Sequence, residues 1–192
     1  AGISFANSSL SGGITNSGSI AGYTGLNFYR STMSGGLINS GTITAFDAPA
    51  ISLDLSGISG GLFNTGAILG SGAGIRVSTT SSISGGITNA GTISGFNEQG
   101  ILIRSFSKVI GGINNSGSIG GLDYGIRLSS NSSISGGLTN SGVISGSSNS
   151  VFVDSGSSLD RLLISGHNTA VFNGAVNAPD TPVTIAGDAI YT

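Results

Sequence analysis

A phrase of nine residues recurs six times in this chain and constrains the fold more than any other feature of the sequence. In its most regular copy it reads Gly-Gly-Ile-Thr-Asn-Ala-Gly-Thr-Ile, from Gly85 to Ile93. The copies begin at Gly12, Gly35, Gly60, Gly85, Gly111 and Gly136, so their spacings are 23, 25, 25, 26 and 25 residues. A period this regular predicts a solenoid, in which each repeat forms one coil of a rod.

Within each repeat, apolar residues alternate with small polar ones, which is the period of a strand with one buried face. Three such segments recur: one covers residues 83–89, the second is centred on Ile93, and the third covers residues 74–77. Frequent glycine and β-branched residues exclude a helix. We therefore predict an all-β fold, a single-stranded parallel β-helix (β-solenoid) with three short strands per coil of about 25 residues.

Stacked coils place equivalent residues about 4.8 Å apart, so each interior position becomes a ladder of like residues. We expect three apolar ladders in the interior. The first contains Leu10, Met33, Ile58, Ile83, Val109 and Ile134. The second contains Ile14, Leu37, Leu62, Ile87, Ile113 and Leu138. The third contains Ile20, Ile43, Ile68, Ile93, Ile119 and Ile144.

An asparagine occupies the same place in every copy of the phrase, and a small residue and a glycine follow it. The six residues are Asn16, Asn39, Asn64, Asn89, Asn115 and Asn140. We expect them to point inward at a turn, where stacked amides hydrogen-bond to one another and to backbone groups. We also expect this turn to use the left-handed backbone region, which asparagine and glycine tolerate better than other residues.

The regular pattern ends near residue 158. We assign residues 1–158 to the repetitive parallel β-helix, and residues 159–192 to degenerate terminal coils or a cap that continues the same solenoid. Pro179 and Pro182 indicate a turn or an edge in this part, because proline cannot donate to a sheet ladder. His167 has no acid or nucleophile beside it in the repeat frame, and we expect it to be an ordinary residue of this tail.

The composition argues against several classes of function. Charged residues make up 7% of the chain and the formal net charge is −2, so we expect no nucleic acid as a partner. No run of 18 apolar residues occurs, so we expect no membrane insertion of this segment. With no cysteine and one histidine, we predict neither a metal site nor a cofactor. The chain does not start like a signal peptide, and we expect a mature or excised segment.

The phrase Ile-Ser-Gly-Gly-Ile-Thr-Asn-x-Gly-Thr-Ile-Ser-Gly resembles the passenger repeats of Gram-negative autotransporters, the type V secreted adhesins. The resemblance covers about residues 8–153. It implies a right-handed parallel β-helix, secretion across the outer membrane through a translocator that is not in this chain, and display at the cell surface on a long stalk. The motif indicates the solenoid much more specifically than it indicates an activity.

The turn between the second and third strands carries the most informative outward side chains. They are Tyr23, Phe46, Asp47, Phe96, Glu98, Asp123 and Tyr124. An aromatic ring beside a carboxylate or amide, repeated along one edge, suits stacking on sugars or contact with a protein. The alternative is that the rings fold back over the corner and shield it. We predict a binding edge here.

The remaining charged residues suggest two further hypotheses. Arg76 and Arg127 share the outward position of the third strand, two coils apart with Leu102 between them, and they either meet an anionic glycan or cover apolar surface with their stems. The acids are scattered, mostly one per coil at turns, whereas polysaccharide-cleaving β-helices need carboxylates together on one face. They are Asp47, Asp54, Glu98, Asp123, Asp154 and Asp160.

The sequence therefore favours a non-enzymatic, extracellular structural protein or adhesin that serves surface display, adhesion or self-association. Its expected partners are a host or bacterial surface glycan or protein, or further copies of itself. The competing hypotheses are a glycan-active β-helix hydrolase or lyase and a filament-forming surface protein. Two carboxylates that project together into one groove would favour the enzyme.

Overall fold

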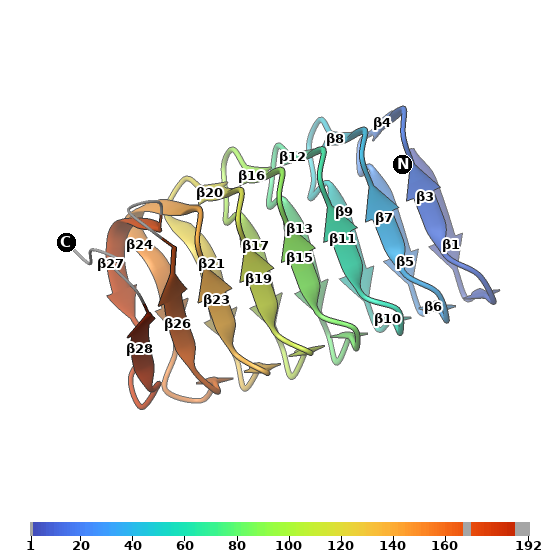
Figure 1. Ribbon diagram of the computed structural model, residues 1–192. Helices are drawn as coiled ribbons and strands as arrows, with labels where there is room; N and C mark the ends of the chain where they lie inside the picture. Colours follow the sequence, from blue (N-terminus) through green and yellow to red (C-terminus); the bar gives the residue numbers. More distant parts are fainter. Residues whose placement is uncertain (1, 167–169, 187–192) are drawn as a thin grey trace.

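The computed structural model describes residues 2–166 and 170–186. It shows an all-β parallel β-solenoid of about seven turns with about 25 residues per turn (Figure 1). The coils stack in chain order, with β1 at one end of the rod and β28 at the other. The predicted architecture of parallel coils with three sheets is confirmed.

Tight turns divide each coil into short strands. In the central coil these are β13 (Ile75–Ser78), β14 (Ser82–Ile83), β15 (Ile87–Asn89) and β16 (Thr92–Gly95). The segment that the sequence indicates as one strand, residues 83–89, is divided into β14 and β15 by the Gly85-Gly86 pair. Gly86 has a φ of 75°, a left-handed conformation that glycine adopts without steric strain.

Two of the three sheets each contain one strand from every coil they cross. The seven-stranded sheet contains β2 (Ser9–Leu10), β6 (Thr32–Met33), β10 (Gly57–Ile58), β14, β18 (Lys108–Ile110), β22 (Ser133–Ser135) and β25 (Ser158–Leu159). The eight-stranded sheet contains β3 (Ile14–Asn16), β7 (Leu37–Asn39), β11 (Leu62–Asn64), β15, β19 (Ile113–Asn115), β23 (Leu138–Asn140), β26 (Leu162–Ser165) and β28 (Val183–Ala186).

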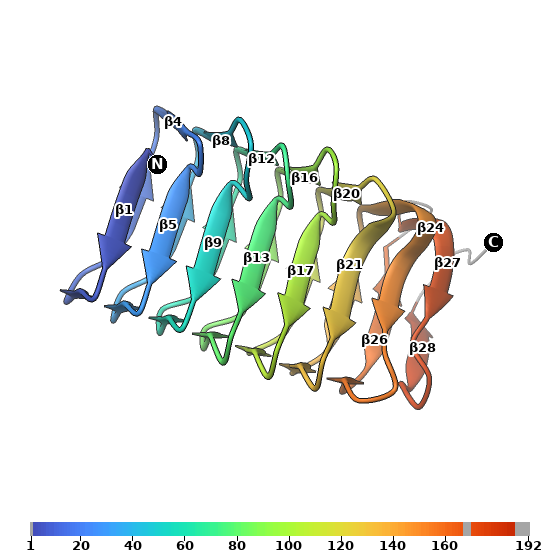
Figure 2. The ribbon, with the colours of Figure 1, turned by 180° about the vertical axis from the view of Figure 1, so that it is seen from behind.

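The third sheet has 13 strands and takes up the two remaining strand positions of each coil. One row lies side by side along the face seen in Figure 2: β1 (Ile3–Ala6), β5 (Leu26–Tyr29), β9 (Ile51–Asp54), β13, β17 (Ile101–Arg104) and β21 (Tyr124–Ser129). The other row contains β4 (Ser19–Gly22), β8 (Thr42–Ala45), β12 (Ala67–Gly70), β16 and β20 (Ser118–Gly121). Strand β24 (Val143–Val153) runs through both rows and joins them, and β27 (Val171–Asn177) pairs with it.

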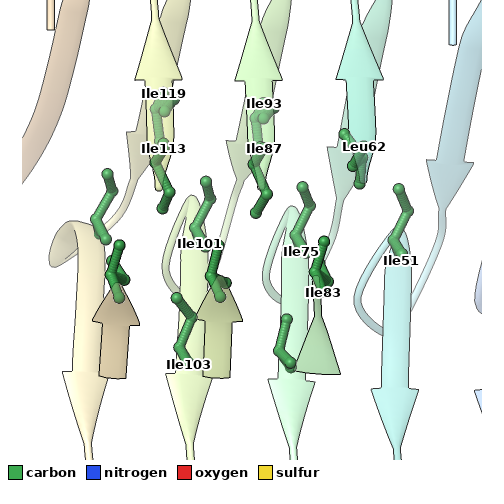
Figure 3. Close-up of a cluster of buried hydrophobic side chains, with 14 of the residues drawn as sticks. Ile51, Leu62, Ile75, Ile83, Ile87, Ile93, Ile101, Ile103, Ile113 and Ile119 are labelled. Carbon is green, nitrogen blue, oxygen red and sulfur yellow. The ribbon is translucent and has the colours of Figure 1, made fainter. Parts of the chain in front are cut away.

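The interior of the rod is one continuous apolar cluster built from the predicted ladders (Figure 3). Equivalent residues pair in register, as Ile68 does with Ile93 and Ile93 with Ile119. The rungs from Met33 onwards are buried, and those of the first coil are partly buried against the same cluster. Each buried isoleucine or leucine stabilises the fold by about 1.5–3 kcal/mol. The predicted apolar ladders are therefore confirmed.

The six asparagines form one hydrogen-bonded ladder inside the rod. At each step, Nδ2 of one asparagine donates to Oδ1 of the asparagine in the next coil, at 2.7 or 2.8 Å. The Nδ2 of Asn89 also donates to the carbonyl oxygens of Gly91 at 3.2 Å and Ser118 at 3.1 Å. Every link points the same way along the rod. The ladder stops at Asn140, whose partner in the next coil is Ile164.

The backbone at this turn differs from our expectation. Neither the six asparagines nor the glycine two residues after each of them has a positive φ. The glycine is required by the stacking, because a Cβ atom at Gly91 would collide with the carbonyl oxygen of Gly66 in the preceding coil. The prediction of a left-handed turn here is therefore wrong, and the close approach of two backbones explains the glycine instead.

A second ladder, made of serines, holds another corner of the coil, and we did not predict it. The backbone N–H of each serine donates to Oγ of the serine one coil further on, as Ser56 does to Ser81 at 2.9 Å. The rungs are Ser8, Ser31, Ser56, Ser81, Ser107, Ser132 and Ser157. From Ser8 to Ser132, the residue before each serine has a positive φ, which reaches 62° at Phe106. The left-handed corner of the coil therefore lies here, after the strands of the row that contains β13.

Strands β25, β26 and β28 keep the register of the coils before them, whereas the pairing of β27 with β24 contains two register shifts. Leu159, Leu162 and Ile164 are buried and continue the interior ladders. Pro179 and Pro182 lie in the connection between β27 and β28. His167 lies outside the described residues. The domain boundary near residue 158 and the capping role of the last coils remain predictions.

Candidate functional site

Four large side chains lie exposed in the turns after β4, β8, β16 and β20, along the upper edge of the rod in Figures 1 and 2. We call them the aromatic edge: Tyr23, Phe46, Phe96 and Leu122, with exposed fractions of 62, 67, 60 and 54%. Each directly follows a member of one stacked rung, which places the four side chains in a line. The rings are exposed and do not fold back over the corner, which was the alternative left open by the sequence.

The predicted acids of this edge lie in the same turns but differ in their surroundings. Asp47 and Asp123 are exposed to solvent. Glu98 is half-buried and lines a groove on the neighbouring face of the rod. Because Glu98 follows Phe96 by only two residues, the edge and the groove are contiguous at this coil.

Tyr124 does not belong to the aromatic edge. It is the first residue of β21, and its ring packs against the ring of Phe152 with the centroids 5.4 Å apart. The guanidinium of Arg127 lies over both rings, at 5.0 Å from the centroid of Tyr124 and 5.8 Å from that of Phe152. The structure therefore divides the predicted binding edge into an exposed line of side chains and a separate cluster on the adjacent face.

A groove of about 480 Å³ crosses three coils on that face, over β17, β21 and the end of β24. We call it the arginine groove. Its lining contains Glu98, Gln99, Leu102, Arg104, Ser105, Arg127, Ser129, Ser130 and Asp154. Sites that hold small ligands usually have volumes of about 300–1,000 Å³, so the groove is large enough for a ligand of that size.

The outward row of this face has the predicted register. Ser52 pairs with Arg76, Arg76 with Leu102, Leu102 with Arg127, and Arg127 with Phe152. Leu102 points outward but is only 5% exposed, because neighbouring side chains cover it. Nη2 of Arg76 donates to Oγ of Ser52 at 3.1 Å. The arginine stems thus shield apolar surface, as one of the two hypotheses expected.

The guanidinium groups on this face are incompletely paired. Nε of Arg76 and Nε of Arg127 are buried and have no hydrogen-bond partner among the described residues. Burial lowers the pKa of Arg76, and the nearby charge of Arg104 lowers it further, while Glu98 and Asp54 act in the opposite sense. The face therefore holds positive charges that repel one another.

Asp154 is committed to a turn at the end of the groove. Its Oδ2 accepts from the backbone N–H of Ser130 at 2.7 Å, and its Oδ1 accepts from that of Gly156 at 3.2 Å. Desolvation raises the pKa of Asp154, but hydrogen bonds from the Ser157 side chain and from backbone N–H groups outweigh it, so the pKa lies below its ordinary value. At neutral pH this carboxylate is ionised and cannot act as a general acid.

Glu98 and Asp154 are the carboxylates that line the groove, and their separation bears on the enzyme hypothesis. Glu98 lies three residues before Ile101, and Asp154 lies three residues after Val151, two coils further on in the same stack. Glu98 lies in the turn before β17, and Asp154 directly follows the last residue of β24, so the two side chains line the groove from opposite ends of its strands. The paired carboxylates of glycosidases lie about 5–10 Å apart. Both oxygens of Asp154 accept hydrogen bonds from backbone N–H groups, so this carboxylate serves the turn.

Arg104 was not among the predicted site residues. It ends β17, next to the left-handed corner, and is exposed. The repeat frame assigns it to the same position as Asp54 and Ser129, and that position changes from coil to coil. The sequence signal for Arg104 was this change, because most positions of the repeat keep one residue type.

Comparison with protein-family models, with curated proteins and with solved structures gives no significant match. Within residues 2–166 and 170–186, no helix is long and apolar enough to cross a membrane. In the same part of the chain, no three His, Cys, Asp or Glu side chains are grouped so that they could hold a metal ion.

Proposed function

We propose that this chain is a non-enzymatic structural protein of the cell exterior, an adhesin stalk that binds its partner through the aromatic edge. The observation that carries the proposal is that three aromatic rings and a leucine are more than half exposed along one line of the rod. These exposed apolar side chains add nothing to the core. Their removal from water favours binding when a sugar ring or an apolar protein surface stacks on them.

The solenoid itself supports a role in display. Each additional coil lengthens the rod by about 4.8 Å while repeating the same core, so the fold suits projection of a binding surface away from a membrane. The resemblance of the repeated phrase to autotransporter passengers supports the same role. It adds that the chain reaches the outside of a Gram-negative cell through an outer-membrane translocator.

The partner that we propose is a glycan or a protein on a host or bacterial surface. Self-association is the second candidate, because the same line of exposed rings would suit side-by-side contact between two rods. Neither partner needs catalytic chemistry, and the backbone hydrogen bonds that hold Asp154 agree with a binding role.

Replacement of Phe46 and Phe96 by alanine tests the proposal. We expect the double variant to bind whole cells or a glycan array at least about tenfold more weakly, because two stacking surfaces are lost. The control is Phe63→Ala, which removes a ring that is 44% exposed on the eight-stranded sheet. Undiminished binding by the double variant would remove the aromatic edge from consideration.

Light scattering at increasing protein concentration separates the two candidate partners. If the mass rises with concentration in the wild type and not in the Phe46→Ala, Phe96→Ala variant, the edge serves contact between copies. A mass that stays monomeric throughout assigns the edge to a foreign partner and ends the self-association hypothesis.

A further inference from the structure

Half of the basic residues in this chain gather on one face of the rod. The chain has six lysines and arginines, and three of them are Arg76, Arg104 and Arg127, on β13, β17 and β21. Arg104 and Arg127 line the arginine groove, and Arg76 lies one coil before Leu102 in the same outward row. The core does not require this concentration, because outward positions of the strands do not contact the interior.

Arg127 is held in a fixed orientation with donor groups unused. Its guanidinium lies over the rings of Tyr124 and Phe152, and such contacts use the face of the planar group. The N–H donors lie in the plane, where a carboxylate can accept two of them at once. Nε of Arg127 is enclosed by the protein, whereas its two Nη groups make no hydrogen bond within the described part of the chain. The orientation is therefore set before any ligand arrives, which lowers the entropy lost on binding.

The rest of the lining indicates the chemistry of the ligand. Gln99, Ser105 and Ser129 offer neutral amide and hydroxyl groups, and Glu98 offers a carboxylate that can accept hydrogen bonds from hydroxyls. A saccharide supplies many hydroxyls for these groups, whereas the side chains of an acidic peptide supply carboxylates alone. Asp154 also lines the groove, but backbone N–H groups already hold both of its oxygens. A nucleic acid would need a wider basic surface than three arginines on a chain of net charge −2.

We propose that the arginine groove binds an acidic oligosaccharide of the uronate type, with a sugar carboxylate on Arg127 and Arg104 and sugar hydroxyls on Glu98 and the neutral side chains. The inference rests on the proposed role in surface binding and names the ligand class of a second surface beside the aromatic edge. The rim at Phe96 and Leu122 offers apolar contact to a sugar ring that extends out of the groove.

Isothermal titration calorimetry with trigalacturonate tests the proposal, with maltotriose as the neutral sugar and triglutamate as the acidic peptide. We expect trigalacturonate to bind and the other two not to bind. Arg127→Gln and Arg104→Gln should each weaken binding by about tenfold or more, since each removes a charge-assisted hydrogen bond. Arg127→Lys should restore part of the affinity, because it returns the charge without the planar fork.

Lys108→Gln is the matched control, because it removes one positive charge from an exposed position on the seven-stranded sheet. Its affinity for trigalacturonate should equal that of the wild type, and circular dichroism should show that all variants are folded. The inference is overturned if trigalacturonate does not bind, if Arg127→Gln binds it unchanged, or if triglutamate binds as tightly.

The two proposals fail separately. Phe46 lies two coils away from the turn that carries Glu98 and does not line the groove, so Phe46→Ala should leave trigalacturonate binding unchanged. Loss of cell binding in the aromatic variants without any trigalacturonate binding would overturn only the acidic-sugar site. Arginine-dependent trigalacturonate binding, with cell binding unaffected in the aromatic variants, would overturn only the role of the aromatic edge.

Discussion

Replacing Asn89 with alanine removes a rung from the middle of the asparagine ladder and should destabilise the protein severely. Nδ2 of Asn89 donates to Oδ1 of Asn115 at 2.8 Å, and Oδ1 of Asn89 accepts from Nδ2 of Asn64 at 2.8 Å. After the substitution, Oδ1 of Asn115 has no donor left among the described residues. Nδ2 of Asn64 keeps the carbonyl oxygens of Gly66 and Thr92.

The magnitude follows from these contacts. A buried acceptor without a partner lowers the free energy of unfolding by about 1–3 kcal/mol, and each further hydrogen bond that is lost lowers it by about 1 kcal/mol. Asn89 also donates to the carbonyl oxygens of Gly91 and Ser118. We therefore expect Asn89→Ala to reduce the free energy of unfolding by about 3–5 kcal/mol.

The same substitution at Asn140 provides a comparison, because the ladder has a direction. Asn140 accepts from Nδ2 of Asn115 at 2.8 Å but has Ile164, not an asparagine, in the next coil. When Asn140 becomes alanine, Nδ2 of Asn115 keeps the carbonyl oxygens of Gly117 and Val143. No ladder amide is left unpaired, so the loss should be smaller, about 1–3 kcal/mol.

Unfolding in guanidinium chloride, followed by far-UV circular dichroism, measures both variants. Because each coil contacts only its neighbours, unfolding need not be two-state, and hydrogen exchange gives a local measurement. The amides of Ser116 and Gly117 donate to the carbonyl oxygen of Asn89 and should exchange faster in Asn89→Ala. If Asn89→Ala destabilises the protein no more than Asn140→Ala does, the directional pairing of amides contributes nothing and the argument fails.

Three further substitutions test other parts of the coil. Gly91→Ala should lower the free energy of thermal unfolding by more than about 3 kcal/mol, because its Cβ would strike the backbone of the neighbouring coil. The control is Gly18→Ala, which should be tolerated because no atom lies within 4 Å of the added Cβ. Phe106→Gly should raise the free energy of unfolding by about 1 kcal/mol, since it relieves a φ of 62°; an unchanged value would show that the corner is not strained. Because the folded pKa of Asp154 is depressed, its contribution to stability is present above the ordinary carboxyl pKa and is lost as pH falls through the folded value. Melting temperatures measured from neutral pH to about pH 2 should therefore fall less steeply in Asp154→Asn, and equal slopes would contradict this.

The fold was predictable because one period organises every level of the structure. A residue type that returns after about 25 positions marks a rung, and the alternation beside it tells which side faces inward. The apolar ladders and the positions of the asparagines follow from those two observations alone. The backbone conformation does not, because the sequence shows that Gly91 is needed without showing whether a dihedral angle or a close neighbour requires it.

The candidate site was only partly predictable, for a related reason. The outward register of Arg76, Leu102 and Arg127 follows from the repeat. The groove depends on where long side chains settle, and it joins Glu98 to Asp154 across 56 positions of sequence that no repeated motif links. Tyr124 shows the same limit. Its place in the repeat predicts a position on the binding edge, but its ring packs against the ring of Phe152.

The positions at which the copies differ are better candidates for function than the positions at which they agree. Where every coil carries isoleucine, asparagine or glycine, the interior, the ladder or the stacking already accounts for the residue. In the outward row none of these three constraints fixes the residue type, yet arginines flank Leu102 on both sides. Leu102, between them in the row, is 5% exposed, and the guanidinium of Arg127 lies over the rings of Tyr124 and Phe152. Packing therefore accounts for the stem of Arg127 and for the face of its guanidinium, and the N–H donors at the outer edge of that group are where the proposed uronate carboxylate would bind.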